Sequence, residues 1–237
     1  MEKTVGVIGG LGPEATIDFY QKLLAKSGAA TDQDHLHVLI NSNPKVPDRQ
    51  KALAGTGPSS GPALVETAQV LEQAGAEFLV MVCNTAHAYE QDIRAATTIP
   101  FISILSESVM ASLRSAPNLQ RAGLMAATGC VDARLYQAQF EAAGVDCVVP
   151  TSAEQTTLMQ LIYRIKSGDH APDIAEQMIK LADTLIDRGA EIILAACTEI
   201  PLALKPSDIA KPLLDCTEIL VDATIAFARC EATNVAE

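Results

Sequence analysis

The amino-acid sequence predicts an α/β protein made of two similar parallel-sheet domains. Short apolar runs alternate along the chain with longer segments of helical period, which is the pattern of a parallel sheet with crossover helices. One local sequence, a Gly-Ala-Glu lead followed by an apolar run and a cysteine, occurs twice. The length of 237 residues is enough for one large domain or two small ones at about 150 residues per domain.

The elements expected in the first half begin with a strand at residues 4–8, which contains Val-Gly-Val-Ile. A helix follows at 13–27, because Pro13 suits the first turn of a helix. Another proline, Pro62, predicts the start of a second helix, and the remaining elements follow from short apolar runs and helical periodicity. The further strands expected here are 37–41, 78–82 and 101–104, and the further helices are 62–74, 87–97 and 105–115.

The second half repeats this alternation, and glycines mark the ends of its helices. Gly144, Gly168 and Gly189 each suit the residue at which a helix ends. The strands expected here are 122–125, 146–149 and 192–195, and the helices are 133–143, 156–167, 172–187 and a last one at 217–228.

The internal repeat sets the domain limits and points to a site. Eight residues separate Gly75 from Cys83, and eight separate Gly189 from Cys197. We expect a first domain of residues 1–103 plus 215–237 and a second of 104–214, related by a pseudo-two-fold axis. Open parallel sheets bind ligands at the carboxyl ends of their strands, so the active site is expected in the cleft between the domains, with one cysteine on each side.

Two thiols that approach one carbon from opposite sides suit proton transfer. Removing a proton from the α-carbon of an amino acid and returning it to the other face needs two groups, each acting as base in one direction and as acid in the other. A thiol has an ordinary pKa of about 8.5, which its surroundings can lower. A buried cysteine is more often a small apolar residue, but the matched spacing sets Cys83 and Cys197 apart.

Composition excludes several classes of partner. The formal net charge of −12 argues against nucleic acid and anionic membranes as partners. No apolar run approaches the roughly 18 to 20 residues that a membrane span needs. The amino terminus lacks the shape of a signal peptide, which predicts a cytoplasmic protein. The six cysteines form no metal-binding spacing, so free thiols are expected and a metal site is not.

Three motifs stand out in this sequence: Gly-Gly-Leu-Gly-Pro-Glu-Ala-Thr at residues 9–16, Cys-Asn-Thr-Ala-His at 83–87 and Cys-Thr-Glu-Ile at 197–200. Together they resemble the signatures of the aspartate/glutamate racemase family, in particular its aspartate racemase branch. The resemblance covers essentially the whole chain. It implies racemisation of an acidic amino acid, aspartate first and glutamate second, by a two-base mechanism without pyridoxal phosphate or any other cofactor. It also implies two α/β domains with the active site between them, and a homodimer.

The resemblance also assigns roles to residues of this sequence. The family's two catalytic cysteines match Cys83 and Cys197, and two cations that contact substrate carboxylates match Arg49 and Lys166, the latter expected on the loop after a helix. The residues that follow the two cysteines match substrate-binding positions, namely Asn84, Thr85, Thr198 and Glu199.

One departure affects the substrate. Relatives usually have Ala-Thr-x-Gly-Thr after the central strand, whereas this chain has Ala126-Ala127-Thr128-Gly129-Cys130. Two hydroxyls that could contact substrate are therefore replaced by Ala127 and Cys130. A second Cys-Thr-Glu-Ile, at residues 216–219, lacks the long apolar run and is interpreted as chance similarity.

Other functions remain open from the sequence. Residues 10–15 also fit a loose dinucleotide fingerprint, but the acidic residues at the required distance, Asp32 and Asp34, precede the next strand instead of ending it. A cysteine-dependent decarboxylase or isomerase of the same superfamily, and a non-catalytic small-molecule binding protein, are the alternatives to a racemase. The glycine-rich residues 55–62 form either a mobile lid or a plain linker. His87 either tunes the Cys83 thiol or serves packing.

Overall fold

The structure, a computed structural model, describes residues 2–230. The outermost positions of the expected first domain, residue 1 and residues 231–237, lie outside the described residues. The chain divides into two compact units. The first joins the residues up to Glu107 to those from Thr217 onward, and the second is Ser108–Cys216. Each unit contains a four-stranded parallel sheet, so the predicted α/β class with two parallel-sheet domains is confirmed.

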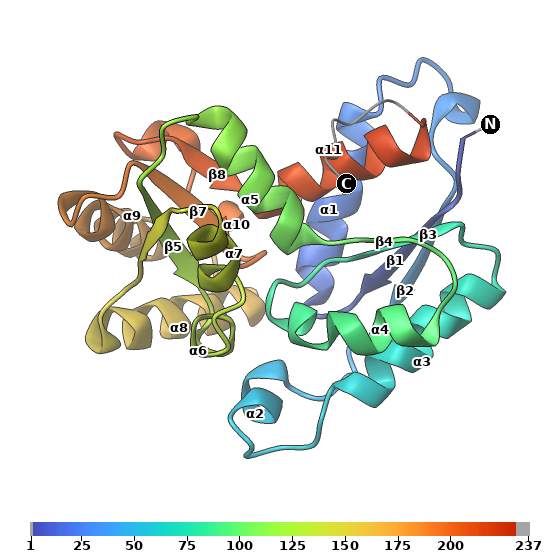
Figure 1. Ribbon diagram of the computed structural model, residues 1–237, viewed down its shortest axis with the longest axis horizontal. Helices are drawn as coiled ribbons and strands as arrows, with labels where there is room; N and C mark the ends of the chain where they lie inside the picture. Colours follow the sequence, from blue (N-terminus) through green and yellow to red (C-terminus); the bar gives the residue numbers. More distant parts are fainter. Residues whose placement is uncertain (1, 231–237) are drawn as a thin grey trace. The chain divides into compact units, whose positions relative to one another are not determined.

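The sheet of the first unit has the strand order β2-β1-β3-β4 (Figure 1). Its strands are β1 (Val5–Gly9), β2 (Val38–Ser42), β3 (Phe78–Met81) and β4 (Phe101–Ile102). All pairs are parallel, and every residue of β1 and β3 is buried. Strands covered on both faces read as continuous apolar runs, which is why these two could be predicted.

Helices cover both faces of this first sheet. On one face, the ring of Phe78 in β3 packs 4.8 Å from that of Phe227 in α11 (Cys216–Ala228). On the other, Leu79 packs with Leu64 of α3 (Gly61–Gln73). The remaining helical segments of this part are α1 (Pro13–Lys26), η1 (Asp32–Asp34), α2 (Arg49–Leu53), η2 (Thr85–Tyr89), α4 (Glu90–Ala96) and the first turn of α5 (Ile104–Ser115).

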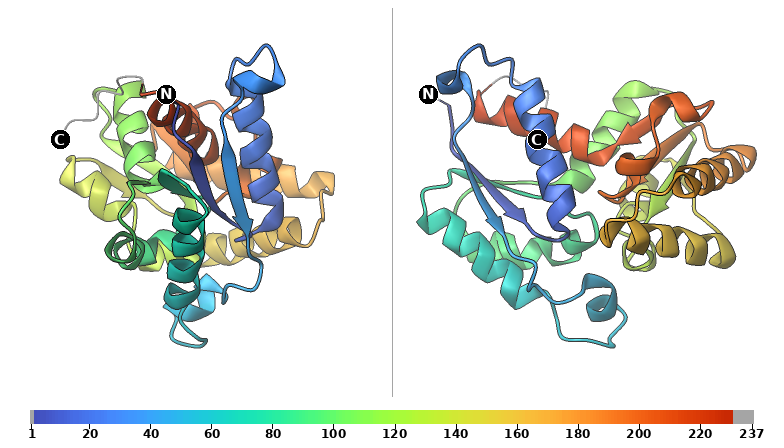
Figure 2. Two further views of the ribbon diagram at one scale, coloured as in Figure 1. Left: turned by 90° about the vertical axis from the view of Figure 1, so that its right-hand side faces the viewer. Right: turned by 180° about the vertical axis from the view of Figure 1, so that it is seen from behind.

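The sheet of the second unit repeats this topology, with the strand order β6-β5-β7-β8. Its strands are β5 (Arg121–Ala126), β6 (Asp146–Val148), β7 (Ile192–Ala196) and β8 (Leu213–Asp215), all parallel (Figure 2). A core cluster joins β5 and β7 to α8 (Ser152–Lys166) and α9 (Pro172–Asp187). The other helical segments are α6 (Thr128–Asp132), α7 (Gln137–Ala142), α10 (Ile200–Ala203) and η3 (Pro206–Asp208).

Several predicted elements differ from the structure. Strand β8, which has three residues, was not predicted. Of the helix expected at 133–143, only α7 is helical, because Arg134 adopts a left-handed φ of 53° before it, and α6 precedes the expected range. Helix α8 begins at Ser152 instead of 156, and α2 was not expected.

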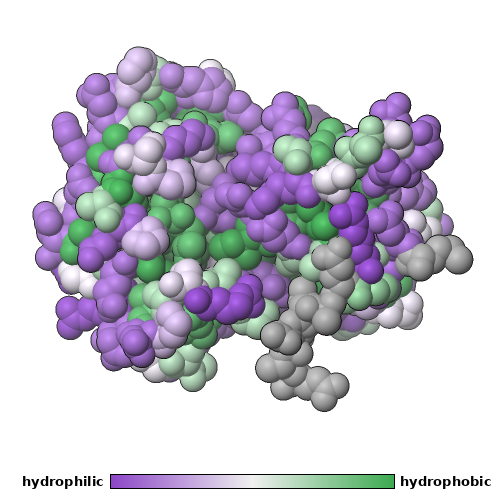
Figure 3. Space-filling view, turned by 90° about the horizontal axis from the view of Figure 1, so that it is seen from above, coloured by the Kyte–Doolittle hydropathy of each residue, from purple (hydrophilic) through white to green (hydrophobic). Residues whose placement is uncertain are grey.

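Polar and charged side chains cover much of the face shown in Figure 3, with apolar side chains between them.

Within the described residues, no helix is both long and apolar enough to cross a membrane.

The same tight contact occurs inside each unit, between a glycine of one strand and the alanine that precedes a neighbouring strand. A Cβ added to Gly6 of β1 would lie 2.7 Å from the Cβ of Ala76, and one added to Gly123 of β5 would lie 2.9 Å from the Cβ of Ala190. Real Cβ atoms do not approach this closely. Glycine therefore occupies equivalent positions in both sheets because the neighbouring chain passes over it.

We predict that Gly123→Ala lowers the free energy of unfolding by about 1–3 kcal/mol, because the added methyl group overpacks the sheet. Urea denaturation measures the effect. An exposed helical substitution, Ala25→Ser, serves as the control and is expected to stay within about 0.5 kcal/mol. An unchanged Gly123→Ala variant would contradict the close contact.

Candidate active site

Cys83 lies just beyond the carboxyl end of β3. The Val82 N–H still donates to the carbonyl of Ile8 in β1 at 3.1 Å, and the Cys83 N–H turns back to the carbonyl of Met81 at 3.0 Å. The chain leaves the sheet at this point and enters the 3-10 segment η2. The Cys83 side chain is 8% exposed, and no residue of the described chain donates to or accepts from its Sγ.

His87 holds the backbone of this turn. Its Nδ1 lies 2.8 Å from the carbonyl oxygen of Cys83, and its Nε2 accepts the Ile104 N–H at 3.3 Å. A carbonyl can only accept and a backbone N–H can only donate, so the proton resides on Nδ1. Burial lowers the pKa of His87 to about 4, so the ring is neutral near pH 7. His87 therefore positions the main chain at Cys83 and does not bond to its thiol.

The predicted substrate-contacting residues of the first unit surround this turn. Asn84 and Thr85 are buried, at 2% and 4% exposure. The Thr85 hydroxyl oxygen accepts from the Gln50 amide nitrogen at 3.3 Å. This bond ties α2, which carries Arg49, to the segment that follows Cys83.

Arg49 donates three hydrogen bonds to backbone carbonyls. Nη1 donates to Val46 at 3.3 Å and to Pro47 at 3.1 Å, and Nη2 donates to Leu11 at 2.7 Å. A guanidinium has five N–H donors, so two remain, and neutral carbonyls leave its positive charge uncompensated. Arg49 is thus fixed against the glycine-rich loop and still carries a charge that a carboxylate could meet.

Cys197 occupies the matching place in the second unit, directly after β7. Its thiol donates to Oε2 of Glu199 at 3.0 Å, and the Thr198 hydroxyl donates to the same oxygen at 3.2 Å. The other carboxylate oxygen of Glu199 pairs with the ammonium of Lys166. Glu199 is 2% exposed, so this ion pair compensates a charge that would otherwise be buried alone.

Electrostatics keep Cys197 protonated in the free protein. Burial raises the pKa of the Cys197 thiol well above its usual range, and the nearby Glu199 carboxylate raises it further. Lys166 opposes this effect. Lys166 is the last residue of α8 and not part of the following loop, and its partner in this structure is Glu199.

The other cysteines have structural surroundings. Cys216 follows the three-residue strand β8 and is the first residue of α11. Its sulfur accepts from the Tyr136 hydroxyl at 3.3 Å, and burial raises its pKa to about 12. Burial likewise raises the pKa of Cys147 to about 12. Cys130 is fully buried.

The glycine-rich loop after β1 is closed by its own hydrogen bonds. The Gly10 N–H donates to the Thr16 hydroxyl at 2.9 Å, and that hydroxyl donates to the Gly12 carbonyl at 3.1 Å. A Cβ at Gly10 would lie 2.4 Å from the backbone nitrogen of Asn43, so the chain already fills this side of the loop. A dinucleotide phosphate needs free N–H groups here, and the Asp32–Asp34 segment precedes β2. These features do not fit a dinucleotide site.

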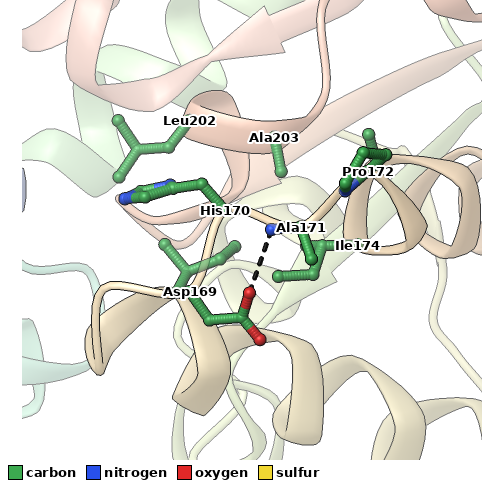
Figure 4. Close-up of a pocket in the computed structure, with 9 residues that line it drawn as sticks. Asp169, His170, Ala171, Pro172, Ile174, Leu202 and Ala203 are labelled. Atoms are coloured by element: carbon green, nitrogen blue, oxygen red, sulfur yellow. Dashed lines mark hydrogen bonds between the residues drawn. The ribbon is translucent and has the colours of Figure 1, made fainter.

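The second unit has a small hollow of about 120 Å³ beyond Lys166 (Figure 4). It is lined by the end of α8, the loop that leads into α9, the first turn of α9 and the end of α10. Most of these lining residues are apolar. The Asp169 carboxylate at its edge accepts from the Ala171 N–H at 2.9 Å. Across the described part of the chain, no three His, Cys, Asp or Glu side chains gather as a metal site would require.

Comparisons with known proteins agree on one family. The family model described as Asp/Glu/Hydantoin racemase matches residues 8–224. The broad specificity amino-acid racemase RacX of Bacillus subtilis (strain 168) is 27% identical over 229 residues, covering 94% of this chain and 96% of that protein. Picrophilus torridus aspartate racemase superposes with a TM-score of 0.86 at 26% identity, covering 96% of this chain and 94% of that one.

Further solved structures share the fold. An aspartate racemase homologue from Pyrococcus horikoshii has a TM-score of 0.78 at 25% identity, covering 96% of this chain and 99% of that one. Glutamate racemase from Francisella tularensis, solved in complex with D-glutamate, has a TM-score of 0.67. It is 15% identical, covers 99% of this chain and 85% of that one, and shows the fold alone.

The Cys197 surroundings predict opposite effects of two substitutions on its reactivity. Glu199→Gln removes the carboxylate that raises the thiol pKa and leaves Lys166 to favour the thiolate, so modification by iodoacetamide should begin at lower pH. Lys166→Met should shift modification to higher pH. Mass spectrometry of the peptide that contains Cys197 separates this thiol from the others. Identical pH profiles in the two variants would contradict the electrostatic account.

His87 predicts a dependence of stability on pH. Its pKa is about 4 when folded and about 6.5 when unfolded, so between these values only the unfolded state binds the proton. This stabilising contribution is complete above pH 6.5 and declines as the pH falls toward 4. Urea denaturation measures the free energy of unfolding of wild type and of His87→Gln. The advantage of wild type in this free energy should fall by about 2 kcal/mol from pH 7 to pH 5. A difference that is constant with pH would contradict the buried neutral ring.

Proposed function

Because the chain belongs to the Asp/Glu/hydantoin racemase family, we propose that it is a cofactor-independent amino-acid racemase whose two acid–base groups are Cys83 and Cys197. The observation that carries the proposal is topological. Strand β3 pairs with β1, and β7 pairs with β5, in the same position of two sheets of identical order. Each thiol follows the carboxyl end of its strand, where parallel sheets bind ligands.

The proposed reaction transfers one proton at each thiol. A thiolate on one face takes the α-proton, which forms an S–H bond and leaves the electron pair on the α-carbon. The thiol on the other face then donates its proton to that carbon and becomes a thiolate. The product has the opposite configuration, and the two cysteines have exchanged protonation states.

Glu199 has a defined role in this scheme. Its carboxylate already accepts a hydrogen bond from the Cys197 thiol at 3.0 Å, so it is placed to hold the proton of that thiol when Cys197 acts as base. The ammonium of Lys166 pairs with one oxygen of the Glu199 carboxylate, and the Thr198 hydroxyl donates to the other, so the carboxylate is held beside the thiol. Lys166 is therefore proposed to act through its ion pair with Glu199.

The first unit is proposed to bind the substrate's carboxylate through Arg49. The two remaining N–H donors and the uncompensated charge of its guanidinium suit this task. Asn84 and Thr85 supply polar groups beside Cys83. Aspartate is the first substrate to test and glutamate the second, because two of the structural relatives are described as an aspartate racemase and a homologue of one.

The proposal predicts complementary defects in two single variants. Cys83→Ala and Cys197→Ala should each abolish racemisation of aspartate, because one face loses its proton donor. Each variant should retain exchange of the α-proton with deuterated solvent for one enantiomer only, and the two variants should prefer opposite enantiomers. Chiral chromatography and proton NMR measure the two activities in protein treated with a chelator and freed of cofactors.

Cys216→Ala is the matched control, since Cys216 is a buried thiol at a strand end outside the proposed site. It should racemise at close to the wild-type rate. Racemisation by Cys197→Ala together with an inactive Cys216→Ala would show that the wrong Cys-Thr-Glu sequence was assigned. Wild-type protein that binds amino acids without converting either enantiomer would be a binding protein instead.

A further inference from the structure

We propose that Thr128, held by Gln155, is a specificity-determining residue whose hydroxyl donates a hydrogen bond to a carboxylate or carboxamide oxygen of the substrate's side chain. The inference rests on the proposed racemase function and names the group that recognises the substrate on the side of Cys197.

The register of the second sheet places Thr128 near Cys197. Ala126, the last residue of β5, is the direct partner of Ala196, the last residue of β7. Adjacent strands lie about 4.8 Å apart, so the residues that follow Ala126 and Ala196 leave the same edge side by side. Thr128 begins α6 two residues after Ala126, and its side chain is half-buried.

Gln155 sets the direction of the Thr128 hydroxyl. Its amide nitrogen donates to the Ala126 carbonyl at 2.9 Å and to the Thr128 Oγ1 at 3.1 Å. The Ala126 oxygen can only accept, so the amide nitrogen, and not its oxygen, must face this strand end. Both amide hydrogens are then used, and the Thr128 oxygen acts as an acceptor toward Gln155.

A hydroxyl that accepts a hydrogen bond still has one hydrogen to donate. No group in residues 2–230 accepts a hydrogen bond from the Thr128 hydroxyl. Gln155 comes from the first turn of α8 and anchors the turn at two points, so the hydroxyl is held in place before any ligand arrives. Such pre-positioning reduces the entropic cost of binding.

The neighbouring positions cannot supply this donor. The positions at which relatives usually have hydroxyls hold Ala127 and Cys130 here, and Cys130 is fully buried beside Tyr136. The Thr198 hydroxyl donates to Glu199. Thr128 is thus the hydroxyl at this strand end with a hydrogen still to donate.

The charge of the site defines what Thr128 recognises. Lys166 is neutralised by Glu199, so the Cys197 side offers a neutral donor in place of an uncompensated cation. A neutral hydroxyl bonds to a carboxylate oxygen and to a carboxamide oxygen alike, whereas a cation would discriminate strongly in favour of the carboxylate. We therefore expect both aspartate and asparagine to use this contact.

The test compares ligands with and without a side-chain oxygen. Thr128→Val keeps the shape of the side chain and removes its hydroxyl. The KM for aspartate should rise about tenfold with kcat within about twofold, because the lost bond is remote from the reacting carbon. The inhibition constant of asparagine should rise similarly, whereas that of alanine should stay within about twofold. Thr128→Ser should restore the KM for aspartate.

Gln155→Glu tests the positioning role. A carboxylate at this place would accept the hydrogen of the Thr128 hydroxyl and turn it away from the substrate. This variant should therefore also raise the KM for aspartate about tenfold and leave the alanine inhibition constant unchanged. Thr156→Val, an exposed threonine of the same helix, is the control and should match wild type.

Three results would overturn the inference or divide it. In Thr128→Val, an equal rise in the KM for aspartate and in the inhibition constant of alanine would make Thr128 a structural residue. Unchanged values of both constants would show that Thr128 does not contact the substrate. A rise in the KM for aspartate with an unchanged inhibition constant of asparagine would show that the contact is made to carboxylates alone, which overturns the expectation that both ligands use it. Wild-type protein that racemises no amino acid would instead overturn the proposed function, which separates the two failures.

Discussion

The surroundings of Cys197 depend on the ion pair between Glu199 and Lys166. A carboxylate that is 2% exposed costs several kcal/mol to bury unless a cation and hydrogen-bond donors compensate it. Here the compensation comes from the ammonium of Lys166, the Thr198 hydroxyl and the Cys197 thiol itself. The thiol is consequently one of the three groups that make the buried carboxylate tolerable. The Glu199 side chain therefore links the protonation state of the Cys197 thiol to Lys166, the last residue of α8.

The sequence was sufficient to predict the features that depend on local pattern. The buried strands read as apolar runs, and the equal spacing from Gly75 to Cys83 and from Gly189 to Cys197 indicated the internal repeat. The glycines at positions 6 and 123 belong to the same repeat, and the structure shows why: each faces the alanine of a Gly-Ala-Glu lead. The start of α8 also has a signal in the sequence, because Thr151 and Glu154 have the spacing of the capping box that they form in the structure.

The partners of the site residues could not be predicted in this way. Lys166 and Glu199 are 33 residues apart, and only the packing of α8 over the sheet brings them together. Gln155 likewise reaches Ala126 and Thr128 across 29 and 27 residues. Sequence patterns report burial and backbone periodicity, whereas a hydrogen bond between distant side chains requires tertiary geometry. The positions of Cys83 and Cys197 at strand ends were thus easier to predict than the side chains that contact the second of these thiols.

The repeat gives the two thiols equivalent places in the fold but different surroundings. Cys83 is held through its backbone by a neutral histidine, whereas Cys197 donates directly to a carboxylate. Under the proposed mechanism, each direction of reaction requires one thiolate and one thiol. Because burial and Glu199 favour the protonated form of Cys197, the free protein presents Cys197 as the proton donor. The opposite direction requires the proton of Cys197 to pass to Glu199. This transfer moves one negative charge from the carboxylate to the sulfur without adding charge, and the Lys166 ammonium favours the thiolate that results. An identical pair of environments would bias neither direction. The difference between the halves is therefore expected to make the two enantiomers unequal as substrates, even though the equilibrium between them is fixed at one.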